Sequence, residues 1–401
     1  MLRTVIYCTN YSNLTQLRYN SALLSRVLYF SELGYKIVIT GRAMTGKPSI
    51  INAGYADILL LDENSSPIKQ LSNIRHLLDK TLDVQLVLAR DLPSAKQALC
   101  FGKVCDCPVY YDSVETWCGY SVRNGKRLVY FYKNWISERM RIKKFTRVIT
   151  HSRTSGRYLE KIYKLSPNRI GVLYAAQPRV SSSIPTTNMR AEVKNDYNSK
   201  LIVCSGGLFV NRGLPELIEM FKHVGWNYNL IFIGDGPLKP QLLNMVNKYN
   251  LQKRVYFIQF STVSSYYGML STADIGIDLR PAIHLNYDLA CSVRVVDYIN
   301  CYLPVITSDT RGFRFIENEY GVVKCISNGM DSRRKAVQLE RFIEEYLCDP
   351  EKTRKRIDNA MIKEFSFEVN LARLKNWLLQ DGLSLKAHIN GEPKNIINMS
   401  L

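Results

Sequence analysis

Short apolar runs alternate with stretches of helical spacing along most of this 401-residue chain, and this alternation constrains the fold more than any other feature. Strands separated by helices of this length form parallel βαβ units, which build doubly wound sheets. Six runs in the first half have strand character: Thr4–Thr9, Lys36–Thr40, Asp57–Leu61, Gln85–Ala89, Val109–Tyr111 and Arg147–Thr150. Six more follow in the second half: Leu201–Ser205, Leu230–Gly234, Val255–Gln259, Ile275–Leu279, Val305–Ser308 and Val322–Cys325. The sequence therefore predicts an α/β protein with two Rossmann-like, doubly wound parallel-sheet domains, because a chain of this length exceeds one hydrophobic core.

A polar, aperiodic segment rich in Ser, Thr and Pro separates the two series of strands at residues 179–188. We predict an N-terminal domain over 1–180, a linker over 181–198 and a C-terminal domain over 199–364, with the two domains facing a cleft. An amphipathic helix is expected over 365–380, returning towards the N-terminal domain, and residues 381–401 are expected to form a frayed tail.

The composition excludes several classes of protein. With 46% hydrophobic and 22% charged residues, the chain has the composition of a folded protein. No apolar run approaches the roughly 18 residues that span a bilayer, and residues 1–7 lead into a strand rather than a signal peptide, so we expect a cytoplasmic protein. Most of the ten cysteines lie in apolar patterns typical of reduced thiols. The close pair Cys105 and Cys107 fits no standard zinc spacing, so no metal site is expected.

The net charge of +19 indicates a polyanionic partner: nucleic acid, an anionic membrane or a phosphorylated substrate. The charge alone does not choose among them.

The second series of strands contains a motif suited to a diphosphate. Gly206 and Gly207 follow the strand Leu201–Ser205, and Arg212 precedes a helix that begins near Pro215. Glycines let the backbone approach a ligand, the amino end of a helix favours an anion, and arginine adds a fork of donors. A Gly-Gly turn beside an arginine is also common as a purely structural feature. No G-x-G-x-x-G follows the first strand of the chain, which argues against a dinucleotide-binding oxidoreductase.

Two neighbouring strand ends are further candidates for nucleotide binding. Gly234 lies in the tight turn Gly-Asp-Gly-Pro-Leu that ends a strand, where a positive φ alone would explain a glycine. Ile258 lies near the exit of Val255–Gln259, which could offer backbone groups and an aromatic surface to a flat base, although core packing accounts for most of this strand.

Helical spacing over residues 292–300 presents a cation and a carboxylate, Arg294 and Asp297, on one face. A short buried strand, Val305–Ser308, follows directly. Ligands bind at the carboxyl rim of open α/β sheets, which makes this pair a candidate binding site. An ordinary surface ion pair on a crossover helix is the competing interpretation.

Together these motifs stand in the order and spacing of a known family. They are Gly206-Gly207 with Arg212-Gly213, Gly234–Leu238, Val255–Phe260, Ala273–Ile277, Ser292–Tyr298 and Leu303–Asp309. In the N-terminal domain, Ala89–Pro93, Val109–Glu115 and Val148–Ser152 resemble the strand ends of the same family. Over residues 1 to 380, the chain resembles retaining glycosyltransferases of GT-B architecture, and in particular glycosyltransferase family 4 (glycosyl transferases group 1).

The resemblance implies a nucleotide-sugar donor held mainly by the C-terminal domain. Arg212 matches the basic residue that grips the diphosphate in the family, and Arg294 matches the Lys or Arg before the helix carboxylate. Asp297 stands where the family usually has a glutamate that binds the ribose hydroxyls. The same donor site is expected to be lined by Gly206, Gly207, Gly234 and Ile258. Retention of anomeric configuration is implied by the family likeness alone.

Two positions depart from the family pattern. A second glutamate is often found about two helical turns before the first, and this chain has Leu289 there; His284, Asn286 and Asp288 in the same loop are possible substitutes. Many relatives have a histidine where this chain has Val114. Asp112, Glu115 and His151 are therefore candidate catalytic residues of the N-terminal domain, while a structural role is the more common one for a lone histidine after a strand.

The expected chemistry follows from charge. Cleavage of a sugar–phosphate bond builds negative charge on the leaving diphosphate, which Arg212, Arg294 and helix amino ends would stabilise. No Asp-x-Asp metal motif is evident, so no metal or other cofactor is expected.

Residues 122–145 interleave aromatic and basic side chains with helical spacing. Such a face is suited to an anionic bilayer, with Trp and Tyr at the headgroups, and would place the protein on the inner membrane face with a lipid-linked or polysaccharide acceptor. A crossover helix with a solvated basic face is the alternative.

Two other functions remain open at the level of sequence, and a third is the weakest alternative. An epimerase of nucleotide sugars would need acids and bases around the sugar, and the N-terminal domain contains no evident cluster of them. A non-catalytic polyanion- or nucleotide-binding protein would be consistent with Leu289 and Val114. RNA binding is not expected, because no RNA-binding signature is present.

Overall fold

The structure, a computed structural model, describes residues 3–11, 21–43, 49–52, 56–62, 65–77, 82–117, 127–178, 189–193, 199–260 and 262–384. The chain divides into two compact units made of discontinuous segments. Unit 1 comprises Met1–Ala175, His284–Asn286 and Asn370–Ile396, and unit 2 comprises Ala176–Ile283, Tyr287–Val369 and Ile397–Leu401. The linker predicted over 181–198 lies outside the described residues except for 189–193, and the predicted tail is described only as far as residue 384.

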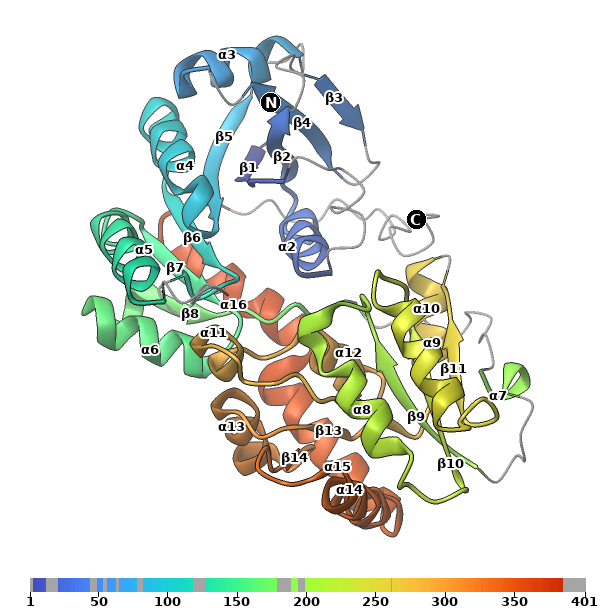
Figure 1. Ribbon diagram of the computed structural model, residues 1–401. Coiled ribbons are helices and arrows are strands. Elements are labelled where there is room, and N and C mark those ends of the chain that lie inside the picture. The colour runs from blue at the N-terminus through green and yellow to red at the C-terminus, as the bar shows by residue number, and fades with distance from the viewer. Residues whose placement is uncertain are drawn as a thin grey trace. The chain divides into compact units, whose positions relative to one another are not determined.

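The described part of unit 1 contains an eight-stranded sheet in the order β3-β4-β2-β1-β5-β6-β7-β8 (Figure 1). Neighbouring strands pair in parallel except β3, which pairs antiparallel with β4. The strands are β1 (Arg3–Cys8), β2 (Lys36–Ala43), β3 (Ser49–Asn52), β4 (Asp57–Asp62), β5 (Asp83–Arg90), β6 (Val109–Ser113), β7 (Arg147–Thr150) and β8 (Ile170–Val172).

Helices cover this sheet and close its core. They are α2 (Ser21–Glu32), α3 (Pro67–Leu77), α4 (Asp91–Cys105), α5 (Arg127–Ile142), α6 (Arg153–Tyr163), the 3-10 turn η2 (Pro167–Arg169) and α16 (Phe367–Gln380). Apolar side chains of α3, α4, α5 and α6 pack with those of the strands in one buried cluster. The last helix docks on β7 and β8: a Cβ on Gly171 would lie 2.1 Å from the indole of Trp377, and Arg147 pairs with Asp381 at 2.9 Å.

Unit 2 is built on a six-stranded parallel sheet in the order β11-β10-β9-β12-β13-β14. The strands are β9 (Lys200–Ser205), β10 (Tyr228–Ile233), β11 (Val255–Ile258), β12 (Ile275–Asp278), β13 (Val305–Ser308) and β14 (Val323–Ile326). Its helices are α7 (Met189–Glu192), η3 (Val210–Arg212), α8 (Leu214–Phe221), α9 (Lys239–Lys248), α10 (Val263–Leu270), α11 (Leu285–Leu289), α12 (Val293–Asn300), α13 (Arg311–Tyr320), α14 (Ser332–Leu347), α15 (Pro350–Ala360) and the π-helical turn η4 (Met361–Phe365).

Successive side chains along the buried strands of unit 2 point to opposite faces of the sheet. Ile275 and Ile277 of β12 pack in the core with α8, α9 and α14, while Gly276 between them faces Tyr298 of α12, where a Cβ would lie 2.3 Å from the ring. Glycine at this position lets α12 approach the sheet closely. The helix therefore projects its own polar side chains over the strand ends.

Both sheets have a point at which the order of strands reverses. In unit 2 this switch point lies between β9 and β12, and in unit 1 it lies between β1 and β5. Ligands of open α/β sheets bind outside the carboxyl ends of the strands at such points. The two parallel-sheet domains confirm the predicted fold class and indicate where in each unit a ligand would bind.

None of the described helices combines the length and the apolarity that crossing a bilayer requires.

Candidate active site

Two glycine turns shape the switch point of unit 2. Gly206 follows β9 with φ of +100°, and Gly234 follows β10 with φ of +135°. A Cβ on Gly234 would lie 2.5 Å from the carbonyl oxygen of Gly206, so both positions require glycine. Gly207 is different, because a Cβ there would meet only the ring of Phe209, an exposed side chain that can turn away.

A buried ion pair lies beside these turns. Asp278 ends β12 and is fully buried, and Arg294 of α12 places Nη2 2.8 Å from its Oδ1. The Nη1 of Arg294 donates to the carbonyl oxygen of Ser205 at 3.0 Å. The side-chain stem of Arg294 also passes Gly206, where a Cβ would lie 3.3 Å from Cδ. The predicted residues Arg294 and Gly206 are therefore neighbours at one rim.

Two more arginines act on the same aspartate. Arg280, two residues after β12, is 7% exposed and stacks on the ring of Tyr287 at 4.6 Å from its centroid. Arg212 ends η3 and is held there by Gly213, whose φ is +67° and where a Cβ would lie 2.1 Å from a carbonyl oxygen. Three arginines from different segments thus surround one carboxylate, Asp278.

The charges of this cluster are unbalanced. Burial alone would raise the pKa of Asp278, but Arg294, Arg280 and Arg212 hold it below its ordinary value, so the group is ionised. Repulsion by Arg294, with a contribution from burial, lowers the pKa of Arg212 to about 10. Three guanidinium groups facing one carboxylate leave an excess of two positive charges.

Several N–H groups of the cluster lack an acceptor. Among the described residues, no acceptor is within reach of Nε and Nη2 of Arg280 or of Nε of Arg294. Buried donors are normally satisfied, and charged donors bind anionic oxygens about twice as strongly as neutral ones do. The arrangement is chemically suited to a compact dianion.

Asp297, the predicted ribose ligand, is already engaged. It is 3% exposed, and its two carboxylate oxygens accept hydrogen bonds from Tyr266 at 3.1 Å and from Tyr267 at 2.7 Å. Burial raises the pKa of Asp297 to about 7, against the opposing effect of the two hydroxyl donors. The aspartate that stands in place of a longer glutamate thus lies back from the rim, beneath two tyrosines.

The hydroxyl of Tyr266 links this carboxylate to the switch point. It lies 2.9 Å from Oγ of Ser205, the last residue of β9, and Ser205 in turn donates its N–H to the hydroxyl of Tyr298 at 2.7 Å. The ring of Tyr266 also lies 5.1 Å from that of Phe260. Of the groups near Asp297, the Tyr266 hydroxyl is therefore the one placed between the carboxylate and the strand end.

Ile258 lies at the carboxyl end of β11, beside β10. Its carbonyl oxygen accepts a hydrogen bond from the N–H of Gly234 at 2.9 Å, so this part of the backbone is occupied by the sheet itself.

The loop that carries the missing family glutamate is also fixed. Leu289 is 3% exposed, so an apolar side chain occupies that position. Asp288 accepts from the backbone N–H and Nε of Arg311, and Asn286 belongs to unit 1, where its Oδ1 accepts from the N–H of Thr116 at 2.7 Å. His284 lies in the same unit 1 segment.

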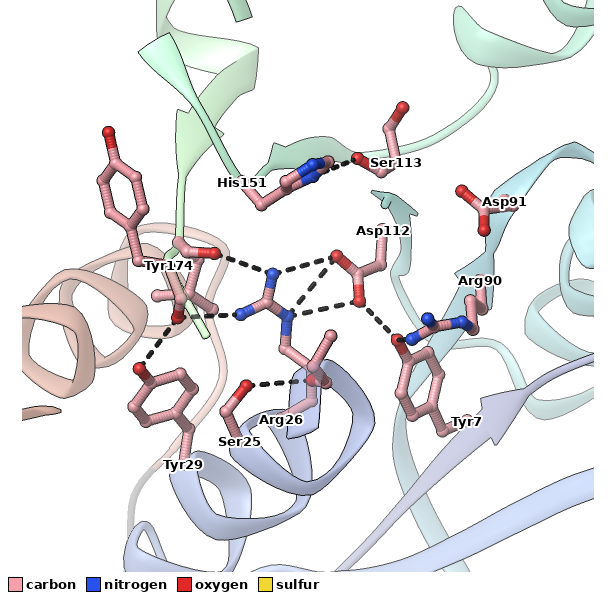
Figure 2. Close-up of polar contacts among 12 residues, drawn as sticks. Tyr7, Ser25, Arg26, Tyr29, Arg90, Asp91, Asp112, Ser113, His151 and Tyr174 are labelled. Carbon is pink, nitrogen blue, oxygen red and sulfur yellow. Dashed lines mark hydrogen bonds and ion pairs between the residues drawn. The ribbon is translucent and has the colours of Figure 1, made fainter. Parts of the chain in front are cut away.

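In unit 1, the candidate Asp112 is the centre of a buried network (Figure 2). Arg26 of α2 pairs with it at 3.2 Å, the hydroxyl of Tyr7 donates to it, and Arg26 also donates to the carbonyl oxygen of Leu173 at 2.7 Å. Burial would raise the pKa of Asp112, but Arg26 lowers it. Asp112 is fully buried and Arg26 is 1% exposed, so neighbouring side chains shield this carboxylate from solvent. Its ion pair with Arg26 links α2 to β6.

The neighbouring rim residue Asp91 was not singled out from the sequence. It follows β5 with φ of +60°, a left-handed conformation that few non-glycine residues adopt, and its Oδ1 accepts from the N–H of Glu115 at 2.9 Å. Burial raises the pKa of Asp91 to about 8. Asn286 donates to the side chain of Glu115, so Asp91, Glu115 and Asn286 form a second polar group at the rim of unit 1.

His151 follows β7 at the same rim, and its Nδ1 lies 3.2 Å from the carbonyl oxygen of Ser113 (Figure 2). That contact fixes the proton on Nδ1 when the ring is neutral. The residue between Ser113 and Glu115 is Val114, which adds no titratable group. No cluster of three or more His, Cys, Asp or Glu side chains with metal-binding geometry occurs in the parts of the chain that the structure describes.

A polar cavity of about 270 Å³ opens at the carboxyl ends of β1, β2 and β4. Its lining is rich in amide and hydroxyl side chains, with two cationic residues, Arg42 and Lys96. Gln97 donates to Gln70 at 2.8 Å, and Gln70 donates to the carbonyl oxygen of Asp62 at 2.7 Å, so the amides are held in place. Such a lining is suited to a hydroxyl-rich ligand.

The residues missed by sequence reasoning share one property: each acts through a partner far away in the chain. Asp278 and Arg280 did leave a signal, because a carboxylate interrupts the apolar run Ile275–Leu279 and a cation follows it. Tyr266 and Tyr267 left none, since two tyrosines on a helix read as ordinary packing residues.

Residues 185–363, which contain the arginine cluster, match the profile of the family Glycosyl transferases group 1. The chain therefore contains a glycosyltransferase domain. No curated protein matches its sequence. Because the match covers the unit 2 strands, it assigns the switch point between β9 and β12 to a glycosyltransferase domain.

Solved structures show the fold of the chain. It is similar to Anabaena HepE (Alr3699) in complex with UDP, with a TM-score of 0.67 at 13% identity over 94% of this chain and 100% of that chain. It is similar to sucrose-phosphate synthase from Thermosynechococcus elongatus, with a TM-score of 0.68 at 13% identity over 94% and 98% of the two chains. It is also similar to WaaG, a glycosyltransferase involved in lipopolysaccharide biosynthesis, with a TM-score of 0.63 at 12% identity over 94% and 99%. The chain therefore has the GT-B fold.

Proposed function

We propose that the protein transfers a sugar from a nucleoside-diphosphate sugar to a hydroxyl of an acceptor, with retention of anomeric configuration. The observation that carries the proposal is the excess of two positive charges around Asp278, from the buried Arg280 and Arg294 and the half-buried Arg212, at the switch point of unit 2. A diphosphate has the charge and the size to satisfy this cluster. The UDP in the HepE structure makes a UDP-sugar the first donor to test.

In the proposed reaction, the bond between the anomeric carbon and the diphosphate oxygen breaks, and negative charge develops on the leaving group. Arg212, Arg280 and Arg294 would stabilise that charge as it forms, in the place where other transferases use a metal ion. The unsatisfied N–H groups of Arg280 and Arg294 are fixed before the ligand arrives, so little reorganisation is needed. No cofactor is part of the proposal.

The proposed acceptor is a lipid-linked glycan or a growing polysaccharide, used at the cytoplasmic face of a membrane. Unit 1 supports a hydroxyl-rich acceptor through the polar cavity that Arg42, Lys96, Gln70 and Gln97 help to line. Glu115, His151 and Asp91 at the rim of the same unit are the proposed residues for handling the acceptor proton, while Asp112 is proposed to hold that rim in shape.

A binding and turnover experiment tests the donor. Thermal shift and calorimetry with UDP, ADP and GDP should identify one nucleoside diphosphate that stabilises the protein, by mass action on the folded state. The matching nucleotide sugar should then release the nucleoside diphosphate in the presence of a glycolipid extract. Binding of inorganic pyrophosphate but of no nucleoside diphosphate would contradict the proposal and favour a non-catalytic polyanion-binding protein.

The same assay separates the epimerase alternative. An epimerase would interconvert two nucleotide sugars without acceptor and without release of nucleoside diphosphate. A glycosyltransferase should release the diphosphate and leave the unreacted donor unchanged in configuration.

A further inference from the structure

Helix α5 (Arg127–Ile142) has two apolar faces, and unit 1 uses only one of them. On the inner face, Phe131 and Trp135 pack on the hydrophobic core and Ile142 is fully buried. Glu138, which is 1% exposed, accepts hydrogen bonds from the hydroxyls of Tyr111 and Tyr163 at 2.7 Å each. The rotation of the helix about its axis is therefore fixed by packing and by hydrogen bonds.

The outer face carries a stripe of large apolar side chains in solvent. Val129 is 67% exposed, Tyr132 55%, Ile136 49% and Met140 59%. Their spacing of three, four and four residues places them on one side of the helix. A helix that only covers a sheet needs no second apolar stripe. The expectation from the sequence that the tryptophan of this stretch lies at the headgroups is wrong, because Trp135 packs on the core.

Cations border the stripe on both sides. Lys133, Arg139, Lys143 and Lys144 are exposed. At about 100° per residue, Lys133 projects to one side of Ile136 and Arg139 to the other, and Lys143 and Lys144 lie in the turn directly after the helix. The one acidic residue of α5, Glu138, is on the buried face.

We propose that this outer face of α5, the stripe Val129–Tyr132–Ile136–Met140 with its bordering cations, docks the protein on an anionic lipid bilayer. Apolar side chains at the centre enter the boundary between headgroups and acyl chains, and the bordering lysines and arginine lie at the lipid phosphates. The net charge of +19 attracts the whole chain to the same surface.

A second copy of the chain is a poorer occupant for this face. In a symmetric dimer the same patch would meet itself, so the cations beside Ile136 would face the cations of the partner. A stripe one side chain wide along a single helix also falls well short of the roughly 800 Å² per partner of a stable interface. A bilayer supplies both the apolar phase and the negative charge.

This inference deepens the proposed function, on which it rests for the membrane-bound acceptor, but it has an independent test. The full-length protein is sedimented with vesicles of phosphatidylcholine alone and with vesicles containing roughly one third phosphatidylglycerol, at low and at high salt. We expect binding to the anionic vesicles, weakened by salt, and little binding to the neutral ones.

Two sets of variants locate the surface. Val129→Asp with Ile136→Asp should weaken binding to anionic vesicles about tenfold or more, because two apolar contacts are lost and two negative charges are gained. Lys133→Gln and Lys144→Gln should weaken it about fivefold for each cation removed. The matched control is Val337→Asp with Ile362→Asp in unit 2, where the two side chains are 63% and 73% exposed, and it should bind like the wild type.

The outcomes are distinct. Equal binding by the α5 variant and the control, or sedimentation equilibrium showing a dimer that only the α5 variant abolishes, would overturn the proposal. Thermal stability and nucleotide binding of both variants should match the wild type, because none of these positions touches the arginine cluster. If the wild type itself bound no nucleoside diphosphate, the proposed function would be overturned, while the vesicle experiment would still test membrane docking by α5.

Discussion

Replacing Arg294 by methionine should separate the two roles of the arginine cluster, folding and anion binding. Arg294 Nη2 lies 2.8 Å from a fully buried carboxylate, so the substitution leaves Asp278 without its nearest partner. Removing one member of a buried pair destabilises a protein by about 3–5 kcal/mol. Because Arg280 and Arg212 still face Asp278, we expect the lower end, about 3 kcal/mol in the free energy of unfolding.

Removing the carboxylate as well should restore part of the stability, because Asp278 is then no longer a buried charge without its nearest partner. In Arg294→Met with Asp278→Asn, however, Arg280 and Arg212 lose their carboxylate, so only part of the lost stability should return. One hydrogen bond between charged groups contributes about 1.5–3 kcal/mol, so Arg294→Met alone, which also lowers the excess positive charge, should bind the nucleoside diphosphate roughly 10 to 150 times more weakly than the wild type.

Urea unfolding and calorimetry measure the two quantities on the same preparations. Arg254→Met is the matched control, since Arg254 is a buried arginine of unit 2 just before β11, at the opposite rim of the sheet. It should lose stability and keep nucleotide affinity. If Arg294→Met folds and binds the nucleoside diphosphate as tightly as the wild type, the cluster is not the diphosphate site.

Three further changes test the surroundings of the two sites. The pKa of Asp297 is raised to about 7, so the folded state holds more protons than the unfolded state between pH 4 and 7. The free energy of unfolding should therefore fall as pH rises through that window. Unfolding measured as a function of pH should show that Asp297→Asn removes up to about 4 kcal/mol of this fall. Gly206→Ala, at φ of +100°, should lower stability by about 1 kcal/mol or more and weaken nucleotide binding. Gly207→Ala should be tolerated. Equal effects of the two substitutions in a thermal-shift titration would refute the conclusion that only Gly206 requires glycine. Asp91→Ala should destabilise by about 2 kcal/mol, because a hydrogen bond is lost at a left-handed residue, while Asp91→Asn should unfold at nearly the wild-type denaturant concentration.

The fold was predictable because apolar periodicity records burial directly. The strands predicted at Arg147–Thr150 and Val305–Ser308 agree with β7 and β13 to the residue. Two strands escaped prediction for different reasons. β3 has four residues and pairs antiparallel with β4, and β8 has three residues and includes Gly171, which lacks a side chain to contribute to any pattern.

The candidate site was predictable only in part, because local patterns report positions and not partners. Gly206 and Arg294 were found from turn chemistry and helical spacing, and the structure brings them together. That Asp297 would lie under Tyr266 and Tyr267 depended on α10 folding across α12, which no local pattern records. The roles predicted for Asp297, Glu115 and His151 stay predictions.

Unit 1 is completed by α16, the last helix of the described residues, and this imposes an order on its synthesis. Residues of α16 and the turn after it supply the indole against Gly171, the carboxylate that pairs with Arg147, and Asn370, whose Oδ1 accepts from the N–H of Tyr174 at 2.8 Å. A ribosome therefore has to synthesise the strands of unit 2 as well, up to Asp381, before the sheet edge at β7 and β8 can be covered. A fragment cut at residue 180 would leave Arg147 without its carboxylate and the strand at Gly171 without the indole that covers it, so truncation between the units should yield an aggregation-prone N-terminal product rather than an autonomous domain.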